Sequence, residues 1–243
     1  MPNLFLFLLL FPVIVQAETW KVTPYRPTVS NPAELSALAH MEIEFGLQAN
    51  QPWRNEGRTS LPFLLKYPFH KNWGLLVGGE AWINQENSTG YGNTSLLLKY
   101  YLPLSSTLAI GFEGGAVLPS AAKPLGQGRT DWLGNLIISQ DIGNLRVDLN
   151  TGIIRQGYHE TQHDQYKYSW ALAASHPLTE NLGLAGEFSG FLGQDQAATG
   201  QWLLALDYQV NRLLVIDVGG SIGLTRASDD YGVFTGFSVL IDP

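Results

Sequence analysis

Short stretches of alternating apolar and polar residues follow one another along this chain from about residue 38 to residue 241. In the first stretch, MEIEFGLQ at residues 41–48, every second side chain is apolar. A period of two is that of a β-strand with one apolar and one polar face. The pattern predicts an all-β chain of about twelve antiparallel strands, at residues 38–49, 59–68, 72–84, 91–102, 107–118, 130–140, 144–156, 166–176, 181–192, 200–209, 212–225 and 231–241.

The polar faces of these strands carry single charges separated by small residues. In the fifth strand, Ala109, Gly111 and Glu113 share one face, opposite Leu108 and Ile110. Alternation alone does not distinguish the inside of a barrel from its outside, and a water-soluble barrel such as a lipocalin keeps its apolar set inside. Small, sparsely charged faces suit a narrow lumen better than a surface in water. We therefore interpret the apolar faces as lipid-facing.

The connections between the predicted strands alternate between short and long. Bacterial outer-membrane barrels have short periplasmic turns and longer outside loops, so this alternation predicts a transmembrane barrel with both termini periplasmic. Aromatic residues flank both sets of connections, as expected for side chains at the two membrane interfaces. The short connections are PFHKN, LPLSS, QDIGN, HPLTEN and QVNR; the long ones are NQPWRNEGR, NQENSTGY, PSAAKPLGQGR, GYHETQHDQ, GFLGQDQAATG and RASDDYG.

The beginning of the chain differs from the rest. Residues 4–15, LFLFLLLFPVIV, form an apolar run that is too short to span a bilayer and suits a signal peptide. Small residues at Val15 and Ala17 predict a signal peptide at residues 1–17, with cleavage before Glu18 and export to the outer membrane. Residues 18–37 contain three prolines and no sustained alternation. We expect an extended N-terminal arm there, ahead of a barrel domain at 38–243.

Composition narrows the possible partners. The formal net charge of −7 argues against nucleic acid, which requires clustered lysine and arginine. The absence of cysteine excludes disulfides, thiolate metal sites and thiol nucleophiles. We expect contacts with outer-membrane lipid, a small-molecule solute and the barrel-assembly machinery, and no cofactor. The chain is too short for a large barrel together with the plug domain of an energy-coupled transporter.

Three segments resemble one protein family. Tyr25-Arg26-Pro27, followed by HMEIEFGLQAN and LPFLLKY, resembles the start of the outer-membrane barrels of the MetA-pathway phenol-degradation family. IDVGGSIGLTRASDDYGVFTGFSVLI resembles the final hairpin of that family, and DWLGNLIISQDIG with LRVDLNTGI is similar to its middle. The resemblance implies an outer-membrane barrel transporter of small, hydrophobic or aromatic solutes, and it brings no catalytic residues. Unlike many outer-membrane proteins, this chain ends on Ile241-Asp242-Pro243 instead of an aromatic residue.

Charged residues on the polar faces form the candidate site. A charge at the lipid-facing midplane of a barrel costs about 2–4 kcal/mol, so we expect these side chains to face the lumen. One interpretation is a polar path for solute with a cation-leaning lining. The predicted lumen-lining residues are Glu42, Glu44, Lys66, Glu80, Lys99, Glu113, Arg146, Asp148, Lys167, Glu187, Asp207 and Asp217.

A second interpretation is a ladder of ion pairs that braces and closes the lumen, because an unpaired buried charge is expensive. Both interpretations stay open at this point, and a narrow, partly ion-paired channel satisfies both. The pairs expected from strand order are Lys66 with Glu44 or Glu80, Lys99 with Glu80 or Glu113, and Lys167 with Asp148 or Glu187.

Catalytic chemistry has little support in the residue pattern. A lipid hydrolase of this kind needs a serine activated by a nearby histidine. The same-face spacing His-x-Ser does not occur in the chain, and His70 and His176 fall in predicted turns. His159 and His163 share one loop with two carboxylates, which we interpret as a solvated loop and not as a metal site. We predict no catalytic residue and no metal site.

The sequence therefore predicts a porin-like transporter of the Gram-negative envelope, for passive or facilitated diffusion of a small solute through a narrow charged lumen. Two alternatives remain: an outer-membrane lipid-modifying enzyme that forms a Ser/His pair only in three dimensions, and a structural or adhesive surface barrel that acts through its loops.

Overall fold

The computed structural model describes residues 20–52, 57–126, 128–157, 165–193 and 196–241. The signal peptide predicted at residues 1–17 lies outside this range. No helix long and apolar enough to cross a membrane is present in the described part of the chain. The strands are β1 (Met41–Pro52), β2 (Arg58–His70), β3 (Trp73–Gln85), β4 (Ser88–Gly90), β5 (Thr94–Pro103), β6 (Leu108–Leu118), β7 (Asp131–Ile142), β8 (Leu145–Gln156), β9 (Gln165–Pro177), β10 (Leu182–Gly193), β11 (Thr199–Asn211), β12 (Leu214–Gly223) and β13 (Asp229–Ile241).

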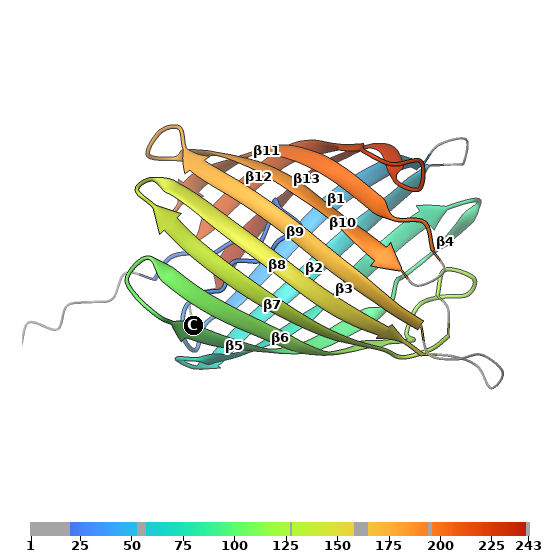
Figure 1. Ribbon diagram of the computed structural model, residues 1–243, viewed down its shortest axis with the longest axis horizontal. Helices are drawn as coiled ribbons and strands as arrows, with labels where there is room; N and C mark the ends of the chain where they lie inside the picture. Colours follow the sequence, from blue (N-terminus) through green and yellow to red (C-terminus); the bar gives the residue numbers. More distant parts are fainter. Residues whose placement is uncertain (1–19, 53–56, 127, 158–164, 194–195, 242–243) are drawn as a thin grey trace, which may run out of the picture.

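The strands form one closed antiparallel barrel (Figure 1). Apart from the short β4, strands that are neighbours in sequence pair with one another, and β1 pairs with both β2 and β13, which closes the ring. The short β4 pairs only with the end of β3, in a small hairpin before β5. The ring itself therefore has twelve strands, and the prediction of an antiparallel twelve-stranded barrel is confirmed.

The two faces of the barrel wall differ as the alternation predicted. On β1, Glu42 and Glu44 are buried, whereas Met41 and Leu47 are exposed. The outward positions of the other strands form an apolar belt. Its exposed members include Leu75, Leu96, Leu98, Phe112, Leu149, Leu172, Leu204 and Val218. A belt of this extent on a barrel requires an apolar environment around it.

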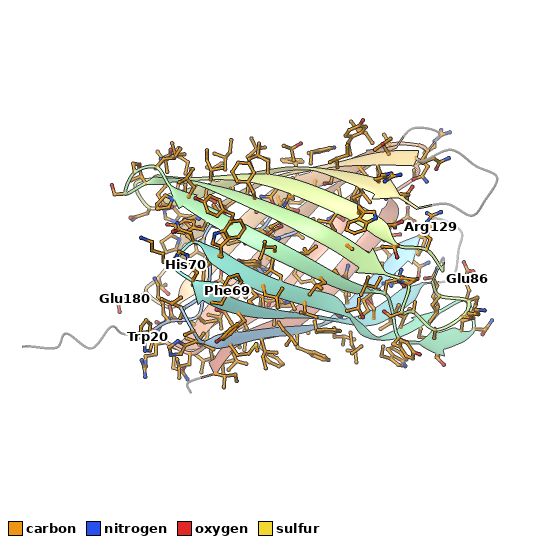
Figure 2. All side chains as sticks on the ribbon, turned by 90° about the horizontal axis from the view of Figure 1, so that it is seen from below. Trp20, Phe69, His70, Glu86, Arg129 and Glu180 are labelled. Carbon is orange, nitrogen blue, oxygen red and sulfur yellow. The ribbon has the colours of Figure 1, made fainter. Side chains whose placement is uncertain are left out.

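Short and long connections lie at opposite ends of the barrel. The short connections follow β2, β5, β7, β9 and β11, and we call their end the short-turn end; the other is the long-loop end. His70 and Glu180 mark the short-turn end in Figure 2, and Glu86 and Arg129 mark the long-loop end. The predicted alternation of connections is therefore present in the fold.

The first and fourth predicted strands start later than expected. β1 starts at Met41 instead of residue 38, because Ala39 adopts a left-handed conformation (φ 61°) and its N–H donates to the Pro68 carbonyl over 2.8 Å. β5 starts at Thr94 instead of residue 91. The chain before it makes the β3–β4 hairpin through Glu86 and Asn87, which both have positive φ.

Residues 20–40, which we call the arm, form no strand and lie inside the barrel. Trp20 lies at the short-turn end (Figure 2), where the Val22 N–H donates to the Arg212 carbonyl. The arm returns to the same end at Ala39. Between these points it contacts strands on every side of the ring, and its blue trace lies between the front and back walls in Figure 1. It is a loop inserted into the lumen from the short-turn end.

Candidate functional site

The arm is held in the lumen by charged and amide side chains of the wall. A buried backbone without secondary structure needs side chains as hydrogen-bond partners. Pro24, Pro27 and Pro32 have no N–H and reduce that need. Six of the other N–H groups donate to side chains on four strands: Thr23 to Glu42, Tyr25 and Arg26 to Glu44, Ser30 to Glu187, Asn31 to Asn150 and Ala33 to Ser139.

Among the residues that the structure describes, two cations are fully buried, and Lys66 on β2 is the first. Its Nζ lies 2.7 Å from Glu42 Oε1 and 2.6 Å from Glu44 Oε1, and it donates to the Thr23 carbonyl over 2.7 Å. Glu42 and Lys66 are directly opposite in the β1–β2 register. One ammonium therefore neutralises part of the charge of two buried carboxylates and also binds the backbone of the arm.

Lys99 on β5 is the second fully buried cation of the described residues. Its Nζ lies 3.1 Å from Glu113 Oε1 and donates to the Pro32 carbonyl over 2.6 Å. Glu113 also accepts hydrogen bonds from the amides of Asn31 and Asn135. This carboxylate is thus saturated by one wall cation, one wall amide and one arm amide.

Tyr25 on the arm lies between the two lysines. The Nζ atoms of Lys66 and Lys99 lie 3.9 and 4.0 Å from the centroid of its ring, at distances of cation–π contacts. Burial, together with carboxylates led by Glu113, raises the pKa of the Tyr25 phenol well above its usual value. The phenol is therefore protonated and donates to the Glu34 carbonyl over 2.9 Å. Tyr25 links the two lysine clusters into one network.

Arg26 reaches β12, which is two strands round the ring from β1. Its Nε and Nη2 donate to Asp217 on β12 over 2.9 and 2.8 Å. Gly46 and Gly236, paired across β1 and β13, make room for the guanidinium: a Cβ built on them would lie 2.5 and 2.6 Å from its atoms. Alanine at Gly46 would displace Arg26, and alanine at Gly236 would also meet the Phe45 carbonyl oxygen at 2.5 Å.

The returning half of the arm is fixed by Arg146 on β8. This guanidinium forms ion pairs with Glu34 of the arm and with Asp141 and Asp148 of the wall. Asp148 also accepts a hydrogen bond from the Ser139 hydroxyl, which in turn accepts the Ala33 N–H. Ala33 itself is fully buried against Ala109 and Ile137.

The structure gathers most of the predicted lumen residues around the arm. The exceptions are Glu80, Lys167 and Asp207. Glu80 pairs with Arg58 at 2.6 Å and contacts neither lysine. The residues that bind the arm directly are Glu42, Glu44, Lys66, Lys99, Glu113, Arg146, Glu187 and Asp217, with Asp148 one contact removed.

The expected ion pairs are only partly correct. Lys66 pairs with Glu44, as one alternative predicted, and also with Glu42; Lys99 pairs with Glu113. The expectation for Lys167 is wrong. Its Nζ lies 4.0 Å from the centroid of the Phe191 ring, and neither Asp148 nor Glu187 is within ion-pair distance. Asp148 instead pairs with Arg146, and Glu187 accepts a hydrogen bond from the Ser30 N–H.

Sequence reasoning missed the arm's own contribution. Tyr25, Arg26, Asn31 and Glu34 were not among the predicted site residues, because the segment has no periodicity that assigns its side chains to a face. One available signal was the adjacent pair of inward glutamates on β1, which needed donors that no neighbouring strand could fully supply. The aperiodic segment immediately before that strand, whose N–H groups are not used in a strand ladder, is a natural source of them.

Beyond the arm the lumen contains a cavity of about 470 Å³, which we call the cup. Val29 of the arm is part of its floor, and Ala227, Ser228 and Asp229 lie at its rim near the long-loop end. A second cavity of about 250 Å³ lies at the short-turn end, lined by residues that include Arg146, His176 and Asp207. The two cavities share no lining residue.

The histidines make structural contacts. The ring of His40 lies 4.7 Å from that of Trp20, and its Nδ1 is 2.7 Å from the Leu38 carbonyl. His70 Nδ1 accepts the Asn72 N–H. His159 and His163 lie outside the described residues. Within the described part of the chain, no three potential metal-binding side chains converge.

The closed ring, the apolar belt and the charged lumen define a twelve-stranded β-barrel of the outer-membrane type. The chain belongs to the family described as "Putative MetA-pathway of phenol degradation", whose model matches residues 33–241. No curated protein matches the chain by sequence.

Solved structures share the fold. The NanC porin superposes with a TM-score of 0.64 at 9% identity, over 82% of this chain and 98% of that porin. The KdgM porin superposes with a TM-score of 0.58 at 13% identity, over 83% and 99%. The KdgM porin in complex with disordered oligogalacturonate gives 0.59 at 13% identity, over the same shares. At these identities the likeness is one of fold.

Proposed function

We propose that this protein is an outer-membrane channel for passive or facilitated diffusion of a small solute, with the arm as its constriction. The observation that supports the proposal is a polar lumen with a cavity at each end and the arm between them. A purely structural barrel has no need of a cup of about 470 Å³. The proposal includes processing before Glu18, insertion through the barrel-assembly machinery, contact with lipid, and the short-turn end and both termini in the periplasm.

Ten of the twelve predicted lumen residues divide into two groups under this proposal, and Glu80 and Asp148 belong to neither. Glu113 and Lys167 line the cup, and Arg146 and Asp207 line the short-turn cavity. We propose that these four line the solute path. The residues that bind the arm, Glu42, Glu44, Lys66, Lys99, Glu187 and Asp217, set the width of the constriction by holding the arm in place.

Charge pairing changes the expected selectivity. A cation-leaning lining assumes acids without partners, yet Glu80, Glu113, Asp148 and Asp217 each have a lysine or arginine nitrogen within 3.1 Å. Paired charges contribute much less to the potential of a pore than isolated ones. We therefore propose a selectivity set by the cup and the constriction, and not by the sum of lumen acids.

Planar bilayers test the proposal. Wild-type protein should give small, defined conductance steps, and a variant that lacks residues 20–34 should give larger ones, because the lumen then loses its constriction. Heat-modifiable migration of both proteins on gels shows that each has folded. If neither the wild type nor the deletion variant conducts, the barrel is closed and the channel proposal is wrong. If both conduct equally, the arm is not the constriction.

No enzymatic role is part of this proposal. His40 and His70 bind backbone groups, and His176 lies at the short-turn end. Hydrolysis of labelled phospholipid by the purified barrel, abolished in His40→Ala or His176→Ala, would favour the enzymatic alternative.

A further inference from the structure

Lys167 on β9 differs from the other cations of the lumen. Lys66, Lys99, Arg26 and Arg146 each form an ion pair with at least one carboxylate. For Lys167, no carboxylate of the described residues is within ion-pair distance, and its ammonium lies over the ring of Phe191 instead. The side chain is half-buried. A half-buried ammonium without a counter-ion retains a strong attraction for an anion.

The walls around Lys167 supply neutral polar groups. Ser169, Ser189 and Gln201 line the cup beside it, and the Gln201 amide donates to the Ser189 hydroxyl over 3.2 Å. Asn135 lies deeper, where its amide binds Glu113 and Asn150. Hydroxyl and amide groups can donate to a bound carboxylate without competing for the lysine.

Two carboxylates also line the cup. Glu113 is bound by Lys99, Asn31 and Asn135, so its charge is compensated within the wall and the arm. Asp229 stands at the rim, at the first position of β13. Neither pairs with Lys167. The charged group of the described lining that lies against Phe191 is therefore the ammonium of Lys167.

We propose that the cup binds a small organic carboxylate, with its anionic group on Lys167 and its flat or apolar body along Phe191. The ammonium supplies the charge-assisted hydrogen bond, and the Phe191 ring and the apolar part of the lining supply contact area. A cavity of about 470 Å³ accepts a molecule the size of a single-ring acid and not a polymer coil. This inference names a substrate class for the proposed channel, and it rests on that proposal in treating the cup as the solute entrance.

Binding of benzoate to the purified, folded barrel in detergent tests the site, with benzamide as its uncharged counterpart. We expect saturable heat of binding with benzoate and much weaker binding of benzamide. Lys167→Gln should weaken benzoate binding roughly tenfold or more, which is the loss of one charged hydrogen bond. Lys71→Gln removes an equal charge in the exposed turn after β2 and should leave the affinity unchanged.

Phe191→Leu gives a second readout. It keeps the charge of Lys167 and removes the ring, so benzoate should bind several-fold more weakly while acetate, which has no ring, should be unaffected. Equal affinity of wild type and Lys167→Gln for benzoate, or no saturable binding to the wild type, would overturn the inference. Binding is measured without a bilayer, so a barrel that binds benzoate but conducts nothing retains the site and refutes only the channel.

Discussion

Arg26 of the arm and Asp217 of β12, which are 191 positions apart in the chain, form a bidentate ion pair inside the barrel. The carboxylate is almost fully buried and the guanidinium is largely so. The arm is therefore attached to β12 as well as to the lysine clusters on β1, β2, β5 and β6. Breaking this pair should loosen the arm without removing it.

Arg26→Gln should lower the free energy of unfolding by about 3 kcal/mol, because it leaves the Asp217 carboxylate buried without its partner. The measurement is urea unfolding of the reconstituted barrel, followed by tryptophan fluorescence. The double variant Arg26→Gln/Asp217→Asn should recover much of the loss, since it leaves no unpaired charge. Equal unfolding midpoints for Arg26→Gln and the wild type would contradict the predicted role of the pair.

Gly46→Ala should displace the arm, because a Cβ at this position would lie 2.5 Å from Arg26 Nη1 and its three nearest atoms all belong to that guanidinium. We expect a larger or noisier single-channel conductance than in the wild type. Gly186→Ala is the matched control: its Cβ would have no neighbour closer than 3.9 Å, so conductance should not change. A change of the same size in both variants would point to a general effect on the wall instead of the arm.

Glu113→Gln and Glu80→Gln should differ strongly in their cost. Glu113 neutralises the fully buried Lys99, and its loss should destabilise the barrel by about 3 kcal/mol. Glu80 and Arg58 are each more than a quarter exposed, and loss of their pair should cost less than about 1 kcal/mol. Unfolding midpoints of the two variants in urea provide the comparison. A larger cost for Glu80→Gln would show that the assignment of buried and solvated pairs is wrong.

The location of the protein can be tested directly. The apolar run at residues 4–15, followed by Val15-Gln16-Ala17, predicts that the mature chain begins at Glu18. Mass spectrometry of the outer-membrane fraction should find that residue first, on a protein whose gel mobility changes on heating. Recovery of the protein in the soluble periplasmic fraction would exclude the membrane assignment.

The sequence by itself determined the barrel wall. A period of two assigns each side chain of a strand to one face, so the inward positions of Glu42, Glu44 and Glu113 could be read without coordinates. The alternation of short and long connections predicted which connections share an end of the barrel. The strand order followed because neighbours in the chain become neighbours in an antiparallel barrel. For pairs between adjacent strands the same rule gave only alternatives, Lys66 with Glu44 or Glu80 and Lys99 with Glu80 or Glu113, and the structure selected Glu44 and Glu113.

Only the tertiary structure decided what fills the lumen. The contacts of Tyr25 with Lys66 and Lys99, and of Arg26 with Asp217, join an aperiodic segment to strands far away in the chain, and no local rule assigns its side chains to a partner. The register shift between Leu61 and Pro62, next to the partner residue Glu80, likewise depends on how β2 and β3 meet. The wall follows from repeating backbone geometry, whereas the arm is placed by buried N–H and carbonyl groups that had to find individual side-chain partners.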